Sequence, residues 1–471
     1  MILCLILYIY FVSFLDKPEK TAPQLSPRAW EQRAKWHIPT DAMDYPVCGL
    51  YQNELKKMGV KILHRSRWFN GVTCEMDDVL AAKVAALKFV TSVEMTRDGT
   101  LPQPVGKRRS MPGTEEPPQA VPPITDDQLE LYNLTKLHEA GYEGQGILMA
   151  ICDGGFQNAQ EMKCFRQKDL ELGHFDFTDD TDGFYGEAGH HGTACLSTIS
   201  AIAEDYHGAA TKAQYYLMRS EEVENNRESP KEMDNLVAAL ETADSLGVNI
   251  FSVSLGYYYF DNSSWNLPKS ALDGKTTRVS RAATIAARKG MLVCAAAGNE
   301  GDKDWGTICA PGDADSILTV GAVDVYGAIG SFSSPGPSAD GRIKPEVCAV
   351  GVNAAVMSPF GFSMYSSGTS FATPLIAGFA ACLWSALPNE NAMQIRERIL
   401  RSADRYTKPD TQKYQYGYGI PDAWKAYNNG EGLTVSVEGT QEAPPQKIIR
   451  GDQILIIRHG HIYNLAGQRI E

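Results

Sequence analysis

The chain has 471 residues, of which 43% are hydrophobic and 21% are charged, and its formal net charge at pH 7 is -13. This length can bury a large core and predicts two or three domains. The negative charge argues against nucleic acid as a partner and against a generally basic membrane-binding surface, because both require a positive surface. The ten cysteines include no CxxC pair and no Cys/His cluster at zinc-ligand spacing, so we expect no metal site built from them.

Residues 1–16 contain an apolar run, Ile2 to Leu15, that has the length of a signal-peptide core. No basic residue precedes the run, and no small-x-small cleavage site follows it. Its second half, YIYFVSFLDK, is equally suited to a first β-strand. The sequence therefore leaves two alternatives open for this segment, an export signal and a strand.

Residues 17–100 have the pattern of a small α+β unit. The expected elements are a helix around Leu50 to Met58, the strands VKIL and GVTCEM, a helix from Asp77 to Leu87, and the strand FVTSVEM. The motif RSRWFN in this unit suggests either an exposed aromatic binding site or the packing of Trp68 and Phe69 in the small core, and we favour packing.

Residues 101–124 are dense in proline and charge, and such a composition predicts a linker rather than a core. Lys107, Arg108 and Arg109 lie in its middle. They indicate either a target for proteolytic cleavage or a solvated run of charge, because exposed linkers are where chain cleavage concentrates.

Residues 125–428 alternate between apolar strands and helices. The expected strands are GILMAIC, AQYYLM, NIFSVSLG, MLVCAAAG and DSILTVGAV, and the expected helices begin at HGTA, at Ser229-Pro230 and at Arg278. This alternation predicts an α/β domain with a parallel sheet covered on both faces, in which function gathers at the carboxyl ends of the strands. Residues 429–471 suggest a short tail of two or three β-strands.

The segment GTSFATPLIAG, from Gly368 to Gly378, places Ser370 where a loop becomes an apolar helix. The free N–H groups of a helix N-terminus give a positive end beside the hydroxyl, which suits a nucleophile. We expect Pro374 to lie in the first turn, where its missing N–H costs the helix little. Taken alone, the same pattern also fits an ordinary N-cap serine.

Three further residues complete a site for acyl transfer. A serine nucleophile needs an imidazole that accepts its proton and a carboxylate that orients the imidazole. Asp153 ends the strand GILMAIC and His191 begins the helix HGTACLSTISAI, so both precede Ser370 in the order Asp, His, Ser. Asn299 follows a strand directly, where its amide can donate to an oxyanion together with the N–H of Ser370.

These motifs resemble those of the subtilisin-like serine proteases, the subtilases. The resemblance covers about Thr125 to Tyr427 and rests on AICDGGF, HGTA, SLG, AAAGNEG and GTSFATP in this order. It implies a subtilisin-like three-layer domain and an endopeptidase that works through an acyl-enzyme, with the triad Asp153, His191 and Ser370 and with Asn299 in the oxyanion hole. It also implies two extended edges between which a peptide substrate lies as an added strand: Ser254, Leu255 and Gly256, and Ala296, Ala297 and Gly298.

The resemblance carries further expectations about partners and location. The unit of residues 17–100 is similar to the propeptides that inhibit many subtilases until they are removed, so the partners are polypeptide substrates and the chain's own N-terminal unit, and we expect a monomer. The tail is similar to the tails of secreted bacterial proteins, which implies a secreted or cell-envelope protein. The chemistry needs no cofactor, and structural calcium enters by family analogy alone.

Several alternatives accompany these assignments. His190 competes with His191 as the base, but only His191 is followed by Gly-Thr, and His207 is expected to be structural. Asp153 precedes Gly-Gly, where many subtilases have a threonine. The glutamates at 221, 222 and 224 suggest a cation site or, as we favour, a solvated acidic loop.

Two other functions fit the same scaffold, a peptide-binding module without catalysis and an acyl-transferring ligase or cyclase. For a histidine base with the ordinary pKa near 6.5, activity is expected to rise between about pH 6 and 7.

Overall fold

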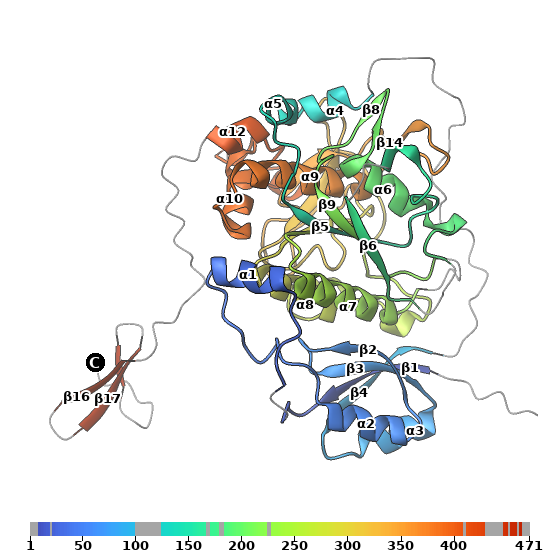
Figure 1. Ribbon diagram of the computed structural model, residues 1–471. Helices are drawn as coiled ribbons and strands as arrows, with labels where there is room; N and C mark the ends of the chain where they lie inside the picture. The colour runs from blue at the N-terminus through green and yellow to red at the C-terminus, as the bar shows by residue number, and fades with distance from the viewer. Residues whose placement is uncertain are drawn as a thin grey trace, which may run out of the picture. The chain divides into compact units, whose positions relative to one another are not determined.

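The structure is a computed structural model (Figure 1). It describes residues 8–18, 21–98, 124–165, 170–178, 183–223, 228–407, 411–428, 446–450, 453–458 and 461–463. The chain divides into two compact units, Met1–Asn429 and Gly430–Glu471. Residues 2–7 of the apolar run, the cleavage target at 107–109 and Glu224 lie outside the described residues.

A seven-stranded sheet forms the centre of the larger unit (Figure 1). Each pair of neighbouring strands runs parallel. Parallel neighbours need crossover connections, which place helices on the faces of the sheet. The order across the sheet is β13 (Val347–Val350), β12 (Leu318–Val323), β11 (Leu292–Ala296), β10 (Ile250–Val253), β5 (Leu148–Asp153), β9 (Gln214–Arg219) and β6 (Glu171–Asp176). The predicted α/β class is confirmed.

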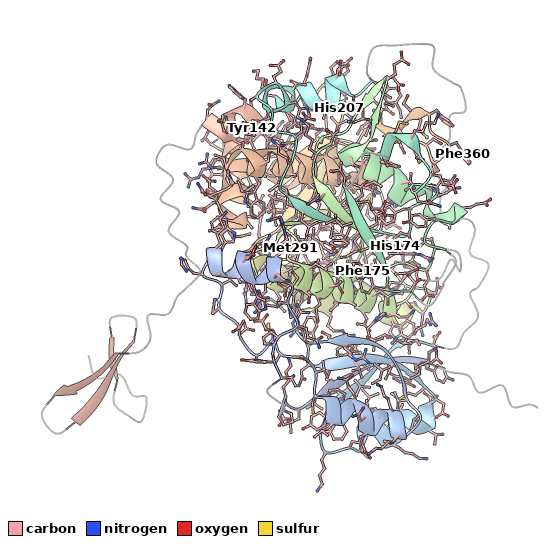
Figure 2. The ribbon with its side chains drawn as sticks, viewed as in Figure 1. Tyr142, His174, Phe175, His207, Met291 and Phe360 are labelled. Carbon is pink, nitrogen blue, oxygen red and sulfur yellow. The ribbon has the colours of Figure 1, made fainter. Side chains whose placement is uncertain are left out.

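Two helix layers enclose this sheet, and side chains fill the space between the layers (Figure 2). On one face lie α7 (Pro230–Leu246) and α8 (Arg278–Arg288), and on the other lie α6 (His190–Ser200) and α9 (Thr369–Ala386). Alternate residues of β5 join the two cores. Leu148, Ala150 and Cys152 pack with α7 and α8, whereas Met149 and Ile151 pack with α9. The result is the expected three-layer arrangement.

The helix signals of the sequence decide where α7 begins and ends. Ser229 and Glu232 form a reciprocal capping box at its start, and Gly247 closes it in the left-handed conformation with φ 76°.

By contrast, β6 was not among the expected strands. Its side chains alternate between partly buried and exposed, because it lies at the edge of the sheet, and its sequence ELGHFD is too polar to indicate a strand.

The central helix α9 is apolar along its whole length. Among the described residues it is the one helix long and apolar enough to cross a bilayer, but 89% of that stretch is buried inside the protein. It contacts β10, β11, β12 and β13 and therefore spans most of the sheet. Its apolar character is explained by this position in the core.

An antiparallel sheet in the order β2-β3-β1-β4 forms the N-terminal unit (Figure 1). Its elements are β1 (Tyr8–Phe14), β2 (Lys61–Ser66), β3 (Gly71–Met76), β4 (Val90–Arg97), α2 (Gly49–Lys57) and α3 (Asp78–Ala85). Of the two alternatives left open for this segment, residues 8–14 therefore form the strand, which is paired on both sides. The helices cover one face around a separate core, and α7 contacts β1, β2 and β4.

One helix of this region, α1 (Pro27–Lys35), was not predicted. Its sequence PRAWEQRAK is polar, and only Ala29 and Arg33 are buried. The start signal was present, because Ser26 caps the helix and proline occupies its first position. Without an apolar stripe in the sequence, however, nothing indicated what the helix would pack against.

The remaining elements are short or lie beside these layers. They are α4 (Asp126–Glu130), α5 (Leu134–Glu139), β7 (Ile202–Ala203), β8 (Tyr206–His207), β14 (Ala354–Met357), β15 (Ser363–Ser366), α10 (Ala392–Ser402), α11 (Lys413–Tyr416) and α12 (Ala423–Asn428). In the second unit, β16 (Gln446–Arg450), β17 (Gln453–Arg458) and β18 (His461–Tyr463) pair as an antiparallel sheet.

Candidate active site

Asp153 ends β5, a strand that is paired on both sides. The residue is 1% exposed, and the Ser220 N–H donates to the backbone carbonyl oxygen of Asp153 at 3.2 Å. Its Oδ1 accepts a hydrogen bond of 2.8 Å from the Gly154 N–H and one of 2.7 Å from His191 Nδ1. A carboxylate only accepts, so Nδ1 carries the proton of the imidazole. The sheet thereby fixes the carboxylate that orients His191.

His191 is the second residue of α6, and the start of this helix lies directly over Asp153. The approach requires Gly192, because a Cβ on this residue would lie 2.1 Å from the Gly155 carbonyl oxygen and 2.9 Å from the Cβ of Asp153. The imidazole remains 32% exposed, so it can meet a substrate. The glycine that follows His191 is thus a packing requirement of the site.

The pKa of His191 is raised well above its ordinary value of 6.5. Burial alone would lower this pKa, because it disfavours the charged imidazolium. The negative charge of Asp153, the electrostatic contribution of Cys195 and the hydrogen bond to Asp153 act in the opposite direction and prevail. The imidazole is therefore a stronger base than the sequence suggested.

Ser370 is the second residue of α9 and is 7% exposed. Its Oγ donates to the carbonyl oxygen of Ser254 at 3.4 Å. No hydrogen bond joins Ser370 to His191, and the structure describes both residues. Cys195 connects them, since its Sγ lies 3.3 Å from the Ser370 carbonyl oxygen and 3.8 Å from His191 Nδ1. The serine and the imidazole are thus held against one common side chain.

The expected position of Pro374 in the first turn is wrong. The helix begins at Thr369, so Pro374 is its sixth residue and lies inside the helix. A proline there removes the N–H that would bond to the carbonyl oxygen four residues earlier, which is that of Ser370. The hydroxyl of Ser254 donates to this oxygen instead, at 2.7 Å, beside the thiol of Cys195.

Asn299 follows β11 and lies next to the start of α9. Its Oδ1 accepts hydrogen bonds from the Thr369 N–H at 2.9 Å and from the Thr369 hydroxyl at 3.0 Å. A backbone N–H bonds only to the oxygen of an amide, so these contacts fix which end of the amide is Nδ2. A Cβ on Gly368 would lie 3.7 Å from Nδ2. The amide donor therefore faces the loop that leads into Ser370.

Cys195 and Thr369 were not singled out from the sequence. Cys195 follows His191 by four residues, which places both on one side of α6, and Thr369 precedes Ser370 directly. Both signals were present, but a thiol or a hydroxyl beside a reactive residue is common without any function.

The two expected substrate edges differ in the structure. Leu255 and Gly256 make no backbone hydrogen bond with the described residues, and Gly256 is exposed, so the edge from Ser254 to Gly256 is open. The second edge needs a correction, because the backbone groups of Ala297 and Gly298 are already engaged and cannot pair with a strand. The partners are Val320 and Cys309 for Ala297, and Thr369 and Ser334 for Gly298. Ala296 to Gly298 therefore form a wall.

The competing histidines lie outside this arrangement. The ring that contacts Asp153 is that of His191, not of His190. His207 is the second residue of β8 (Figure 2), with its ring 5.3 Å from that of His138. The backbone N–H of His207 donates to the hydroxyl of Thr125, which is not part of the site.

The expected solvated acidic loop is wrong for Glu221 and Glu222, which are 4% and 5% exposed. Glu221 accepts from the Tyr257 hydroxyl, and Glu222 pairs with Arg97 and Lys231. One cluster of carboxylates, formed by the glutamates at 221, 228 and 232, has oxygens within 4.8 Å of one another. These donors fit calcium poorly, because backbone N–H groups already occupy both oxygens of the third carboxylate.

The N-terminal unit meets α7 through the motif RSRWFN. The carboxylate of Glu241 on α7 accepts from the Ser66 hydroxyl at 2.5 Å and from the backbone N–H groups of Arg67 and Trp68 at 2.8 and 3.2 Å. The Trp68 side chain packs into the core around α7 and α8, not into the small core of its own unit. The packing interpretation was therefore wrong about the partner.

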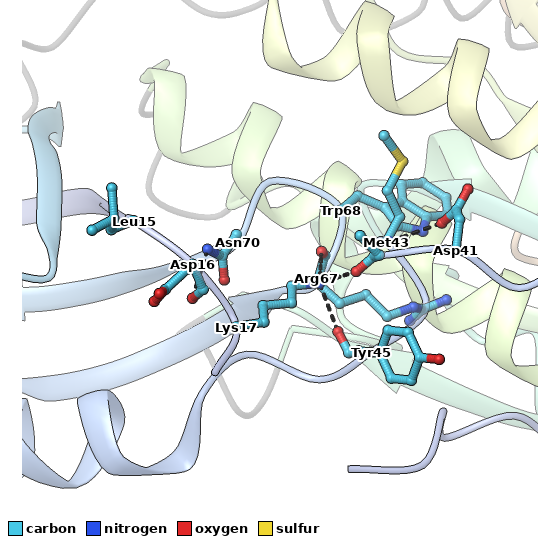
Figure 3. A pocket seen from close by; sticks show the side chains of 10 residues that line it. Leu15, Asp16, Lys17, Asp41, Met43, Tyr45, Arg67, Trp68 and Asn70 are labelled. Carbon is cyan, nitrogen blue, oxygen red and sulfur yellow. Dashed lines mark hydrogen bonds between the residues drawn. The ribbon is translucent and has the colours of Figure 1, made fainter. Parts of the chain in front are cut away.

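The segment between β1 and α2 forms a second contact with α7. Arg33 of α1 is buried and bonds to Asp44 and to both carboxylate oxygens of Asp244. Lys17 Nζ donates to the carbonyl oxygens of Ala42, Tyr45 and Arg67 at 2.6 to 2.7 Å beside a cavity of about 680 Å³ (Figure 3). The segment and the RSRWFN motif are thus joined into one docking surface.

Comparisons with known proteins agree with this geometry. The sequence model of the subtilase family matches residues 144–419, and that of the peptidase S8 propeptide domain of Bacteroidota matches residues 9–111. Serine protease AprX of Bacillus subtilis is 28% identical over 311 residues, which are 58% of this chain and 65% of that protein. Subtilisin E of the same species is 28% identical over 291 residues, 60% of this chain and 66% of that protein.

This chain thus spans just under two thirds of the length of these two relatives. Among solved structures, MycP1 from Mycobacterium smegmatis superimposes with a TM-score of 0.52 at 18% identity, over 66% of this chain and 86% of that one. At this identity the likeness shows the fold.

Proposed function

Because this chain belongs to the subtilase family, we propose that it is a serine endopeptidase with Asp153, His191 and Ser370 as its catalytic triad. The observation that carries the proposal is the hydrogen bond of 2.7 Å between His191 Nδ1 and the buried carboxylate of Asp153. With the proton on Nδ1, the lone pair of Nε2 is available to accept the proton of the serine. The contact of Cys195 with both His191 and Ser370 supports the same pairing.

In this mechanism His191 accepts the proton of Ser370 Oγ while the oxygen attacks the carbonyl carbon of a peptide bond. The imidazolium then gives the proton to the leaving amine, and an acyl-enzyme remains. A water molecule, activated by the same imidazole, releases the acyl group. The Ser370 hydroxyl leaves its weak bond of 3.4 Å to the Ser254 carbonyl oxygen when it turns toward His191. Catalytic hydrogen bonds often tighten only when substrate is bound.

The negative charge that develops on the attacked carbonyl oxygen needs donors. We assign this role to Asn299 Nδ2 and to the backbone N–H of Ser370. Thr369 supports the assignment, because it holds Oδ1 of Asn299 and leaves Nδ2 as the group that faces the nucleophile. The N–H of Ser370 belongs to the first turn of α9, where it has no partner within the helix.

We further assign the N-terminal unit as an intramolecular inhibitor of the peptidase. The propeptide match over residues 9–111 supports this role, as do the contacts of the unit with α7. The end of β4 also contacts the catalytic domain, because Arg97 binds Glu222 and Asp98 accepts from Asn262. Substrates are polypeptides, and the protein acts outside the bacterial cytoplasm. The chemistry uses no cofactor.

A fluorophosphonate probe tests the proposal, because it reacts with a serine that a neighbouring base activates. Ser370 is expected to be labelled, and labelling is expected to vanish in Ser370→Ala and to fall sharply in His191→Ala. Ser363→Ala, which changes a serine of β15, serves as a matched control and is expected to label normally. A protein that leaves Ser370 unlabelled after removal of the N-terminal unit is a binding module. Product analysis with an added amine distinguishes hydrolysis from ligation.

A further inference from the structure

The helix α1 lies apart from the sheet of its own unit and packs against the catalytic domain (Figure 1). Arg28 Nη2 donates to the Gly146 carbonyl oxygen at 3.2 Å and to Asn249 Oδ1 at 2.7 Å, and these residues come just before β5 and β10. Ile38, which follows α1, lies against Gly290 just before β11, where an added Cβ would lie 2.5 Å from the Ile38 Cδ1. The helix thus lies at the amino ends of three central strands.

This position is at the edge of the sheet opposite the proposed catalytic groups. Asp153 ends β5 and Asn299 follows β11, so those groups gather at the carboxyl ends of the strands. The strand β4 reaches that other edge, because Arg97 at its end binds Glu222, which comes after β9. The N-terminal unit is therefore attached to the catalytic domain at both edges of the central sheet.

The end of α7 supplies acceptors for α1. The last carbonyl groups of a helix have no partner within the helix. The Ser26 N–H donates to the Ser245 carbonyl oxygen at 2.8 Å, and its hydroxyl donates to that of Leu246 at 3.0 Å. The Gly247 carbonyl oxygen accepts from Arg28 Nε at 3.1 Å. The start of α1 thus caps α7, and the positive charge of Arg28 is favourable beside the negative end of the helix dipole.

Charged side chains beside this cap are buried between the two parts. Arg33 is 3% exposed and binds both carboxylate oxygens of Asp244 on α7 at 2.9 Å. Lys289, which follows α8, binds Asp44 at 2.8 Å and Asp41 at 3.0 Å. Hydrogen bonds between charged groups are about twice as strong as neutral ones, so this second attachment adds substantially to the affinity of the unit.

We propose that the contacts of residues 26–44, which we call the α1 anchor, keep the N-terminal unit on the catalytic domain after the linker is cut, so that the unit continues to inhibit the cut enzyme. The inference rests on the proposed function, because it concerns the inhibitor assigned there. When one of two attachments opens, the other holds the unit nearby at an effective concentration on the order of millimolar, so the unit closes again before it leaves. Cutting the linker is therefore not sufficient for activation, which also requires loss of the anchor or digestion of the unit.

The first experiment measures binding and does not depend on catalysis. The full-length protein carries Ser370→Ala, a protease site between residues 101 and 123 and a fluorescent label on Met1, and it is cut completely at the inserted site. Analytical ultracentrifugation with fluorescence detection then gives the dissociation constant of the unit. Arg28→Ala removes three hydrogen bonds to the catalytic domain and is expected to raise this constant by about 10- to 100-fold. Arg28→Glu places a negative charge beside the negative end of α7 and is expected to raise it further.

Glu31→Gln is the matched control, because Glu31 lies one turn along α1 from Arg28 and is exposed. Within the described part of the chain its side chain makes no hydrogen bond to the catalytic domain, so the dissociation constant is expected to match that without the change. Lys35→Ala removes a separate contact, the bond of 2.6 Å from Nζ to the Pro388 carbonyl oxygen, and is expected to weaken binding less than Arg28→Ala. This variant decides the question if the Arg28 variants do not fold.

The second experiment measures inhibition in the protein that keeps Ser370. The cut protein is diluted in steps, and a fluorophosphonate reports the fraction of Ser370 that is accessible. In the wild type this fraction is expected to stay low at concentrations at which Arg28→Glu is already fully labelled. An inhibitor held only by its sheet would instead be lost at the same concentration in both proteins.

The outcomes distinguish the two proposals. If Arg28→Ala, Arg28→Glu and Lys35→Ala leave the dissociation constant unchanged, or if dilution releases the wild type and Arg28→Glu alike, the α1 anchor is wrong while the peptidase function stands. If Arg28→Glu loses the unit on dilution and Ser370 still remains unlabelled, the proposed peptidase function fails while the anchor stands.

Discussion

The hydroxyl of Ser254 donates a hydrogen bond of 2.7 Å to the carbonyl oxygen of Ser370. This oxygen would bond within α9 to the N–H of residue 374, but that residue is proline. The proline therefore frees the carbonyl of the nucleophile, and a residue of the substrate edge takes the place of the helical donor. The hydrogen bond couples the edge that we expect to bind the substrate to the serine that we propose as the nucleophile.

Removal of this donor is expected to destabilise the fold. In an inactive Ser370→Ala background, which prevents self-digestion, Ser254→Ala is expected to lower the free energy of unfolding by about 1–2 kcal/mol, because the buried carbonyl oxygen loses its stronger partner. Pro374→Ala restores a helical N–H, so the same Ser254→Ala change is expected to cost clearly less in that background. Urea unfolding of the four proteins measures the difference.

Ser385→Ala serves as the matched control, because its hydroxyl bonds only to a carbonyl of its own helix and its residue is partly exposed. A change below about 0.5 kcal/mol is expected there. Equal costs for Ser254→Ala with and without Pro374 would show that the proline and the serine are not coupled.

The pH at which activity reaches half of its maximum is expected to be higher than for a histidine with the ordinary pKa. Only neutral His191 accepts the proton of Ser370, and its pKa is raised well above 6.5, so kcat/KM is expected to rise with pH and reach half of its maximum above pH 6.5. Asp153→Asn removes the charge that raises the pKa, so the midpoint is expected to move down and kcat to fall by about 10⁴-fold. A midpoint at or below 6.5 in the wild type would contradict the role of Asp153.

The same shift predicts an opposite trend in stability. A histidine whose pKa is higher in the folded state stabilises the fold when it is protonated. This contribution is complete below pH 6.5, the unfolded value, and is lost as pH rises through the higher folded value. In the Ser370→Ala background the unfolding free energy is therefore expected to fall over the range in which the wild type gains activity. The trend is expected to vanish in His191→Ala.

Loss of the amide donor is expected to act on the transition state. Asn299→Ala is expected to lower kcat by about 10²- to 10³-fold with little change in KM, which is the known effect of removing this donor in subtilisin. Thr369→Val keeps the size of the side chain but loses one of the two bonds that orient the amide, so a smaller fall in kcat is expected. If Asn299→Ala raises KM and leaves kcat unchanged, the amide binds the substrate and not the oxyanion.

The contact at Glu241 is expected to hold the N-terminal unit after the linker is cut. Glu241→Ala leaves the donors of Ser66, Arg67 and Trp68 without their acceptor, so the affinity of the unit is expected to fall by at least about 100-fold. A protease site inserted between residues 101 and 123 allows cleavage, and size-exclusion chromatography then measures retention of the unit.

Glu54→Ala is the matched control for this experiment. Glu54 forms an exposed ion pair with Lys57 on the opposite face of the unit, and such pairs contribute little. Retention is expected to match the wild type. Release of the unit by Glu54→Ala and not by Glu241→Ala would place the docking surface elsewhere.

The local elements of this protein could be predicted because their signals are local. Ser229, Pro230 and Gly247 mark the ends of α7 through capping and backbone conformation, and the structure places the helix between them. Strands such as LMAICD are continuous apolar runs, as expected for strands buried on both faces. The edge strand β6 and the polar helix α1 escaped prediction, because each depends on a partner that is distant in the sequence.

The site, too, has features that the sequence determines and features that only the tertiary structure decides. By itself the sequence determined which residue types end the strands and open the helices, and this is the basis on which we propose Asp153, His191, Asn299 and Ser370 as the catalytic groups. Only the tertiary structure decided that Trp68 packs on α7 and that Ala297 forms a wall. Those contacts join segments more than 40 residues apart or settle which hydrogen-bonding groups remain free, and no local pattern encodes either.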